Sequence, residues 1–219
     1  MTDHYPFQNP PLPYAYNALE PFIDEKTMHL HHDRHLQTYV DNLNKALQNE
    51  PTLQTLPLEQ LICNVYGLPS EVQTAIHNNA GGVYNHIFYF EGMRPGPQAP
   101  SGGLLQQINR SFGNVEAFQK QMKEAALSVF GSGYAWLVSD RMGGLKIVTT
   151  ANQDTPLCSN LCPILNLDVW EHAYYLKHYN LRADYIDDWF RVVNWDQVNK
   201  RYQNCEKKKY WELFEFQMV

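Results

Sequence analysis

The sequence predicts an α+β protein, with an N-terminal antiparallel helical hairpin followed by a C-terminal α/β domain that contains a three-stranded antiparallel sheet. Two long segments with helical periodicity come first, at about residues 24–49 and 70–90. A segment rich in proline and glycine, residues 92–103, then interrupts the helical pattern. Beyond it, after further helical residues, apolar and β-branched runs bounded by glycines indicate strands.

Composition and charge exclude several classes of protein. The chain has 219 residues, of which 44% are hydrophobic, as in ordinary globular proteins. Its net charge of −6 argues against a nucleic-acid partner, which usually requires an excess of basic residues. No run approaches the roughly 18 apolar residues of a membrane span. No signal peptide is recognisable, so a cytoplasmic location is expected, although a secreted or surface form whose signal had been removed would look the same.

The four cysteines are too sparse for a disulfide-based scaffold in a chain of this length. They are Cys63, Cys158, Cys162 and Cys205. Cys158 and Cys162 form a single C-x3-C pair with no second pair nearby, which is a weak zinc signal. Ordinary reduced thiols are the expectation.

The first elements place polar side chains beside an apolar stripe. Residues 1–21, rich in proline and tyrosine, predict an extended arm, and a helix is expected over 24–49. At 3.6 residues per turn, His31, His35 and Tyr39 form a narrow stripe next to the apolar face. This arrangement is typical of a site at an interface between elements.

The second long helix, over 70–90, follows a short helix at 57–67 and contains an internal conflict. Gly81 and Gly82 lie in its middle, where each glycine costs about 1 kcal/mol relative to alanine. Such a cost is expected where another group must approach closely. Gly82 lies one turn before His86, so a side chain is missing beside a candidate ligand.

The segments after residue 103 complete the predicted fold. We expect helices over 104–111 and 114–130, a hairpin of strands 134–139 and 145–150, a third strand at 163–168, and helices over 170–180 and 185–193.

These elements predict four units along the chain. They are an N-terminal helical hairpin domain at 1–91, a linker at 92–103, a C-terminal α/β domain at 104–203, and a C-terminal extension at 204–219. The extension indicates a charged linker and a short amphipathic helix. It is expected to dock on its own subunit or, alternatively, to contact a partner.

Four residues stand out as candidate metal ligands, although they lie far apart in sequence and a single histidine on a helix is usually structural. Asp168 and His172 are four positions apart, so on a helix or at the turn into one they point the same way. With His31 and His86 they make a set of three imidazoles and one carboxylate. Such a set suits iron, manganese or zinc better than copper(I) or calcium.

Six segments, in this order, resemble the iron/manganese superoxide dismutases. The segments are residues 12–21, 31–39, 78–86, 131–137, 152–157 and 168–175. The resemblance implies an enzyme in which two superoxide radicals give dioxygen and hydrogen peroxide at one redox metal. It also implies that His31, His86, Asp168 and His172 hold this metal, with a solvent molecule completing the site.

The resemblance favours one manganese ion per subunit. Manganese-type members have glycine where this chain has Gly82 and glutamine where it has Gln153, whereas iron-type members usually place the glutamine on the helix. Gly82 is therefore expected to leave room for Gln153. An iron-dependent or metal-interchangeable dismutase is the alternative.

The resemblance also implies roles around the metal. Gln153 would tune the metal's potential through a hydrogen bond to its solvent. Tyr39 would donate a hydrogen bond towards Gln153. His35 and Tyr39 would line the substrate approach, with Arg182 near it.

Aromatic and interface residues complete the set implied by the resemblance. Trp170 and Trp136 would form an aromatic wall around the metal. Glu171 would cross a homodimer interface to the partner's His172, and Tyr175 would meet the partner's His35. Dimers that pair into tetramers are an alternative assembly. Departures from the family pattern affect this wall and its surroundings, at Leu36, Phe90, Tyr134 and Asn166.

Two other functions use the same residues. A zinc hydrolase would need a general base, and none is evident in the right place; zinc also cannot change oxidation state. A non-catalytic metal-binding relative is the second alternative, and the presence of all four ligands with Gln153 argues against it.

Overall fold

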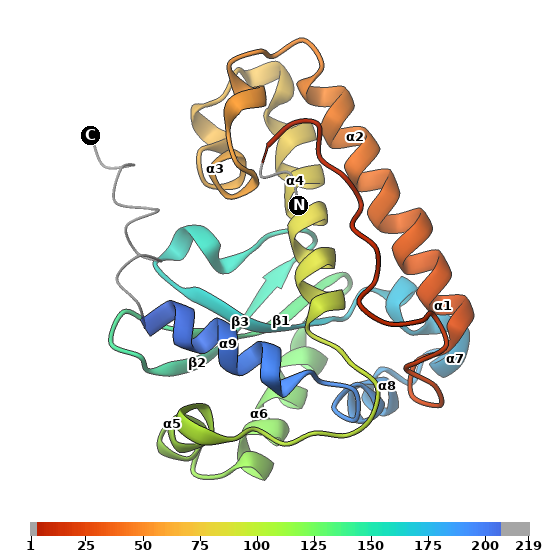
Figure 1. Ribbon diagram of the computed structural model, residues 1–219, viewed down its shortest axis with the longest axis vertical. Helices are drawn as coiled ribbons and strands as arrows, with labels where there is room; N and C mark the ends of the chain where they lie inside the picture. The colour runs from red at the N-terminus through yellow and green to blue at the C-terminus, as the bar shows by residue number, and fades with distance from the viewer. Residues whose placement is uncertain (1–3, 207–219) are drawn as a thin grey trace.

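The computed structural model describes residues 4–206 and has the predicted α+β architecture. The hairpin consists of α1 (Glu25–Leu30), η1 (His31–Leu36), α2 (Gln37–Leu47), η2 (Leu53–Thr55), α3 (Leu58–Cys63), η3 (Val65–Gly67) and α4 (Ser70–Glu91). Figure 1 shows α2 and α4 side by side, and the two helices pack along each other. The side chain of Asp24 accepts a hydrogen bond from the Thr27 amide and so caps α1.

The sequence predicts one continuous helix over residues 24–49, but this helix is irregular. Residues His31–Leu36 form a π-helical turn, η1, between α1 and α2. A π-turn widens the backbone and changes the direction of the side chains that follow, and such turns are frequent at functional sites. Here the turn carries both His31 and His35.

The second part of the chain is built on a three-stranded antiparallel sheet in the order β2-β1-β3. Its elements are α5 (Gly102–Phe112), α6 (Val115–Ser128), β1 (Gly133–Ser139), β2 (Leu145–Ala151), η4 (Pro156–Ser159) and β3 (Cys162–Asp168). All seven residues of the central strand β1 are buried. The register places Tyr134 opposite Asp168, so a buried phenol lies beside the end of β3.

The helices after the sheet differ from the prediction. They are η5 (Glu171–Ala173), α7 (Tyr175–His178), α8 (Arg182–Trp189) and α9 (Trp195–Glu206). The expected helix over 170–180 is broken because Tyr174 leaves the helical conformation, and α7 ends at His178, before Tyr179, which has a positive φ of 51°. Asp168 ends β3, in agreement with the strand predicted at 163–168, and His172 lies beyond it in η5.

Helix α9 was not predicted from the sequence, although a signal was present. Trp195, Val198, Tyr202 and Cys205 recur at helical spacing and are buried, and α9 packs against β3. The many polar residues between them hide this stripe. Because α9 reaches Glu206, it takes in the start of the predicted C-terminal extension, whose remaining residues 207–219 lie outside the described part of the chain.

The expectation of four reduced thiols is wrong, because the structure pairs them in two disulfides. Cys63 is bonded to Cys158 and Cys162 to Cys205, across 95 and 43 residues of sequence. The Cα–Cα distances of 5.2 and 5.9 Å lie in the usual range for disulfides. A low cysteine count shows only that the core does not depend on disulfides, and spacing along the chain cannot reveal which cysteines the fold brings together.

The N-terminal arm contains neither helix nor strand among its described residues, but residues 16–22 form consecutive turns, so the predicted extended conformation is wrong there. The arm is held against the hairpin. The Phe7 amide donates to the Asn44 side chain at 2.8 Å, and Asn44 donates back to the Phe7 carbonyl at 2.9 Å. The Tyr14 hydroxyl donates to the carbonyl of Phe90 at 2.9 Å, near the end of α4. These contacts fix the arm beside the two helices that carry His31 and His86.

Candidate metal centre

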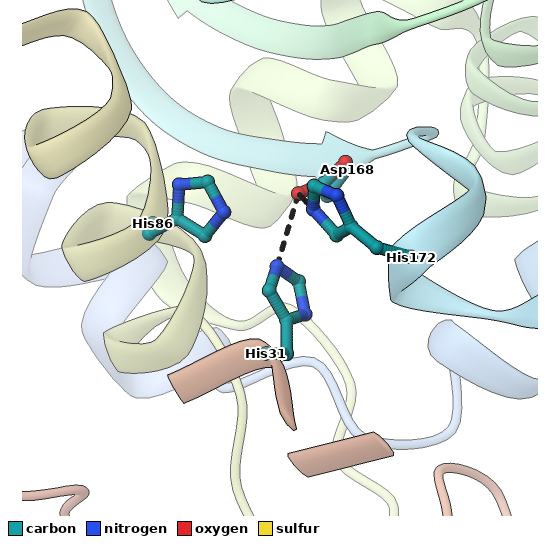
Figure 2. Close-up of side chains that lie close together, drawn as sticks. All are labelled: His31, His86, Asp168 and His172. Atoms are coloured by element: carbon teal, nitrogen blue, oxygen red, sulfur yellow. Dashed lines mark ion pairs between the residues drawn. The ribbon is translucent and has the colours of Figure 1, made fainter. Parts of the chain in front are cut away.

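The structure brings together the four residues selected from the sequence. His31 comes from η1, His86 from α4, Asp168 from the end of β3 and His172 from η5. Figure 2 shows their side chains converging on one point, and one ligand atom of each lies within 4.8 Å of the others. The site therefore draws on four separate elements from both parts of the chain.

The atoms that face this point lack hydrogen-bond partners. His31 Nε2, His86 Nε2, His172 Nε2 and Asp168 Oδ2 are buried, and none of them makes a hydrogen bond. Asp168 Oδ2 lies 3.2 Å from His31 Nε2 and 3.4 Å from His172 Nε2. Buried polar atoms are normally paired, so four unpaired atoms aimed at one place indicate a ligand that satisfies all of them. Three nitrogens and one carboxylate oxygen fit a divalent or trivalent transition metal.

Neighbouring groups orient these side chains. His86 Nδ1 lies 2.7 Å from the carbonyl of Gly82, so Nδ1 donates and Nε2 is left as a lone-pair donor. The Trp170 amide donates to Asp168 Oδ1 at 2.8 Å, which leaves Oδ2 facing the cluster. The Tyr185 hydroxyl donates to the Asp168 carbonyl at 2.8 Å and ties the end of β3 to α8.

The electrostatics keep the ligands in metal-binding form. Burial lowers the pKa of His31 to about 4 and lowers the pKa of His86 well below its usual value, so both imidazoles are neutral at neutral pH. Burial by itself would raise the pKa of Asp168, but the adjacent His172 and His31 lower it overall. His31 and His86 thus face the Asp168 carboxylate as neutral imidazoles, the form in which histidine binds a metal.

Gln153 is held from three sides, next to two rings that pack against His86. Its Oε1 accepts hydrogen bonds from the Tyr134 hydroxyl at 3.1 Å and from Asn85 Nδ2 at 3.0 Å. Its Nε2 donates to the Tyr39 hydroxyl at 3.0 Å. The direction is the reverse of the predicted one, because two donors already occupy Oε1 and only the amide N–H groups remain for Tyr39.

Sequence reasoning missed Asn85 and the part played by Asn166. Besides Oε1, Asn85 Nδ2 contacts the Gln153 carbonyl at 3.1 Å, and Asn166 Nδ2 donates to the Asn85 carbonyl at 3.0 Å. Asn85 precedes His86 inside one of the recognised motifs, which was the available signal. Tyr134, noted as a departure, retains a hydrogen-bond donor to Gln153.

The two glycines of α4 make room for different groups from those predicted. A Cβ at Gly81 would overlap the Gln153 carbonyl oxygen, whereas a Cβ at Gly82 would overlap the ring of Tyr39. The expectation that Gly82 admits Gln153 is therefore wrong in its steric reason. Gly81 admits the Gln153 backbone, and Gly82 admits the tyrosine that Gln153 contacts.

Comparison with known proteins agrees with this geometry. Residues 6–94 match the family profile "Iron/manganese superoxide dismutases, alpha-hairpin domain", and residues 100–201 match the profile of the C-terminal domain of the same family. The chain belongs to the iron/manganese superoxide dismutase family. Both halves of the family pattern are present, in order, and each contributes two of the four clustered residues.

Several relatives within the family carry manganese in their names. The chain is 49% identical over 205 residues to "Superoxide dismutase [Mn] 3" of Leptolyngbya boryana, an alignment that covers 93% of this chain and 86% of the relative. It is 45% identical to "Superoxide dismutase [Mn]" of Thermus aquaticus, with 92% and 99% covered. It is 47% identical to "Superoxide dismutase [Mn] 2" of Bacillus anthracis, with 90% and 94% covered.

In this member of the dismutase family, the predicted aromatic residues lie at different depths. The Trp170 ring stacks on His172 with centroids 5.4 Å apart. Trp136 is fully buried and packs against Tyr134 and Phe88, one layer behind the histidines. Trp170 therefore contacts a predicted ligand directly, whereas Trp136 supports Tyr134.

The residues predicted to line the substrate approach, His35, Tyr39 and Arg182, make different contacts. His35 is half-buried and stacks on His172 with centroids 4.2 Å apart, beside the likewise half-buried Tyr39. The Arg182 guanidinium donates to the carbonyls of Val129 and Gly131 at 2.7 and 2.9 Å and so holds the chain that follows α6. Its position near the substrate approach stays a prediction.

Glu171 and Tyr175 lie on the surface next to the cluster. Both are exposed; Glu171 precedes His172 in η5, and Tyr175 begins α7. Among the described residues, 4–206, no helix is both long and apolar enough to cross a membrane.

Proposed function

We propose that this chain is a manganese superoxide dismutase whose metal is held by His31, His86, Asp168 and His172. The observation that carries the proposal is the convergence of four buried, unpartnered polar atoms of a transition-metal donor set. A redox metal held by these four residues would supply the one-electron oxidation and reduction that dismutation of superoxide requires.

The chain's own residues provide a path for protons to the site. Two superoxide anions and two protons give one dioxygen and one hydrogen peroxide, so the reaction consumes protons. Burial raises the pKa of the Tyr39 phenol above its usual value, so this group keeps its proton at neutral pH. Because the Tyr39 oxygen accepts from Gln153, its own proton stays available for relay towards the site.

Gln153 couples this phenol to the second part of the chain. Both ends of its amide are engaged, so its orientation is fixed before any substrate arrives. We propose that Gln153 tunes the metal's potential through its amide and positions Tyr39. We propose that His35 and Tyr39 form the entrance for the small anionic substrate.

The exposed position of Glu171 supports a homodimer. A carboxylate beside His172, without a hydrogen bond of its own among the described residues, is available to a second subunit. We propose that Glu171 bridges to the partner's His172 and that Tyr175 lies in the same interface. This bridge would hold His172 through its non-metal nitrogen.

The disulfides favour one of the two locations that the sequence left open. Stable disulfides form in oxidising surroundings and are rare in the reducing cytosol. We propose that the protein works in an oxidising environment, such as the cell surface or the medium. Detection of the protein only in the cytosolic fraction, with its cysteines reduced, would contradict this location.

The ligand assignment is tested by His86→Ala, with His77→Ala as the matched control on the same helix. His77 is partly exposed and pairs with Asp154 at 3.1 Å. We expect His86→Ala to lose its manganese and all measurable turnover, whereas His77→Ala keeps its manganese. Full metal content in His86→Ala, measured by elemental analysis, would contradict the assignment.

A further inference from the structure

One disulfide links the two parts of the molecule close to the site. Cys63 ends α3 in the hairpin, and Cys158 lies in η4, five residues beyond Gln153. The other disulfide, Cys162–Cys205, joins β3 to α9 and lies entirely within the second part of the chain. Cys63–Cys158 is thus a covalent connection between the hairpin and the segment that carries Gln153.

The two disulfides differ in their access to solvent. Cys158 is exposed and Cys63 is partly exposed, whereas Cys162 and Cys205 are each only 2% exposed. A cavity of about 600 Å³ is lined by Cys63 and Cys158 and also by Gln153. A small reagent can therefore reach the Cys63–Cys158 bond from a space that borders the Gln153 segment, but it cannot reach the Cys162–Cys205 bond without local opening of the fold.

The segment between β2 and β3 is anchored near its two ends, through Asn152 and Gln153 and through Asn160, and has few anchors between them. Asn152 and Asn160 mark its ends in left-handed conformations, and only three of its residues between them are buried, namely Gln153, Pro156 and Leu157. Its links to α4 are the hydrogen bonds from Asn85 and the partly exposed His77–Asp154 pair. Segments with few buried contacts open locally at low cost, so a covalent link to α3 matters more here than in the core.

We propose that Cys63–Cys158 is a thiol–disulfide exchange site for dithiol reductants, and that its redox state controls how firmly residues 152–160 hold Gln153. In the oxidised form the segment is tied to α3 and Gln153 is kept on Tyr39 and Tyr134. In the reduced form the segment is released and the Gln153 amide loses its fixed orientation. The exchange is inferred from the accessibility of the Cys63–Cys158 bond, and only its effect on turnover rests on the proposed function.

The disulfide is reduced in two thiol–disulfide exchange steps. A thiolate of the dithiol attacks Sγ of the more exposed Cys158, the Sγ–Sγ bond breaks, and Cys63 leaves as a thiolate that takes up a proton. The second thiolate of the reductant then attacks the resulting mixed disulfide and releases Cys158 as a thiol. Two electrons pass to the protein, and the reductant leaves as its own disulfide.

The experiment uses manganese-loaded protein treated with dithiothreitol without denaturant. Samples are quenched with iodoacetamide at intervals, and peptide mass analysis identifies the alkylated cysteines. We expect Cys63 and Cys158 to be alkylated roughly tenfold or more faster than Cys162 and Cys205, since exposed disulfides exchange readily. Amide hydrogen exchange over residues 152–160 should rise in step, while the manganese content stays unchanged.

Turnover gives a separate readout. We expect it to fall about tenfold on reduction, the size of effect seen when groups around a metal are disturbed, and to recover on reoxidation. The Cys63→Ser/Cys158→Ser variant should show the lowered turnover without dithiothreitol and no further response to it. The Cys162→Ser/Cys205→Ser variant is the matched control and should respond to dithiothreitol as the unaltered protein does.

Two results would overturn the inference. One is alkylation of all four cysteines at the same rate, which would mean that accessibility does not distinguish the bonds. The other is selective reduction without a change in hydrogen exchange over 152–160, which would mean that the bond does not hold the segment. If oxidised, manganese-loaded protein has no dismutase activity, the proposed function fails, while the alkylation and exchange measurements still decide the redox site.

Discussion

At the scale of single residues, the amide of Gln153 connects the most groups around the site. It accepts from Tyr134 and Asn85 and donates to Tyr39, so neither end of the amide can rotate without breaking a buried hydrogen bond. A buried donor or acceptor left without a partner costs about 1–3 kcal/mol. The side chain is therefore a rigid link between the sheet and the helices.

We expect Gln153→Ala to keep its metal and to lose about 10–100-fold in turnover, the usual range for residues that support metal ligands. The metal stays because none of the four clustered atoms is removed. Gln153→Asn retains the amide on a shorter side chain, so its turnover should lie between that of the unaltered protein and that of Gln153→Ala. Elemental analysis and superoxide turnover of the same samples check this, and unchanged turnover in Gln153→Ala would refute the role.

The sequence was sufficient to select the clustered residues but not their partners. His31, His86, Asp168 and His172 lie in motifs with specific patterns, and the structure brings all four together. Hydrogen-bond directions and orienting groups depend on which atoms meet in space. The role of Asn85 and the reversed bond to Tyr39 could therefore not be obtained from spacing along the chain.

At the scale of elements, helix α4 contains two glycines that lower its intrinsic helix stability but allow other groups to pack closely beside His86. Its two central glycines let the Gln153 backbone and the Tyr39 ring approach the helix next to His86. Glycine is unfavourable within a helix, so the helix is stabilised by its packing against α2 and β3 instead of by propensity.

We expect Gly82→Ala to destabilise the protein by about 1–3 kcal/mol, as overpacking of a filled interior does, and to displace Tyr39. Gly103→Ala is the matched control, because a Cβ at that helical position meets no atom within 4 Å. The control should be neutral or stabilising by about 0.4–1 kcal/mol. Thermal unfolding of both variants decides the point; equal melting temperatures would count against the close approach of Tyr39.

The order of the elements was predictable because the spacing of apolar residues identifies helices and strands, and glycine and proline indicate where these elements end. The hairpin of helices and the three strands appear close to their expected places. The π-turn at His31–Leu36 and both disulfides were not predicted, because they depend on packing or pairing between segments that local periodicity does not describe. Helix α9 was missed for another reason: its buried residues do recur at helical spacing, but the many polar residues between them hide the pattern.

At the scale of the whole molecule, the site lies where the two parts of the chain meet. Each part supplies two of the four clustered residues, so neither part can form the site alone. The exact division at residues 92–103 stays a prediction. The second subunit is proposed to complete the site from outside, through Glu171.

We expect Glu171→Ala to weaken the homodimer and to loosen His172, because the bridging carboxylate is removed. Glu116→Ala, at an exposed position near the start of α6, is the control and should leave assembly unchanged. Sedimentation velocity over a dilution series measures both. Identical profiles for Glu171→Ala and the unaltered protein at low concentration would argue against the bridge.

The decisive experiment reloads metal-free protein separately with manganese, iron and zinc, and measures superoxide turnover and bound metal in each sample. We expect one tightly bound metal per chain, high turnover with manganese, and none with zinc, which cannot change oxidation state. Manganese bound at His31, His86, Asp168 and His172 without turnover would contradict this expectation.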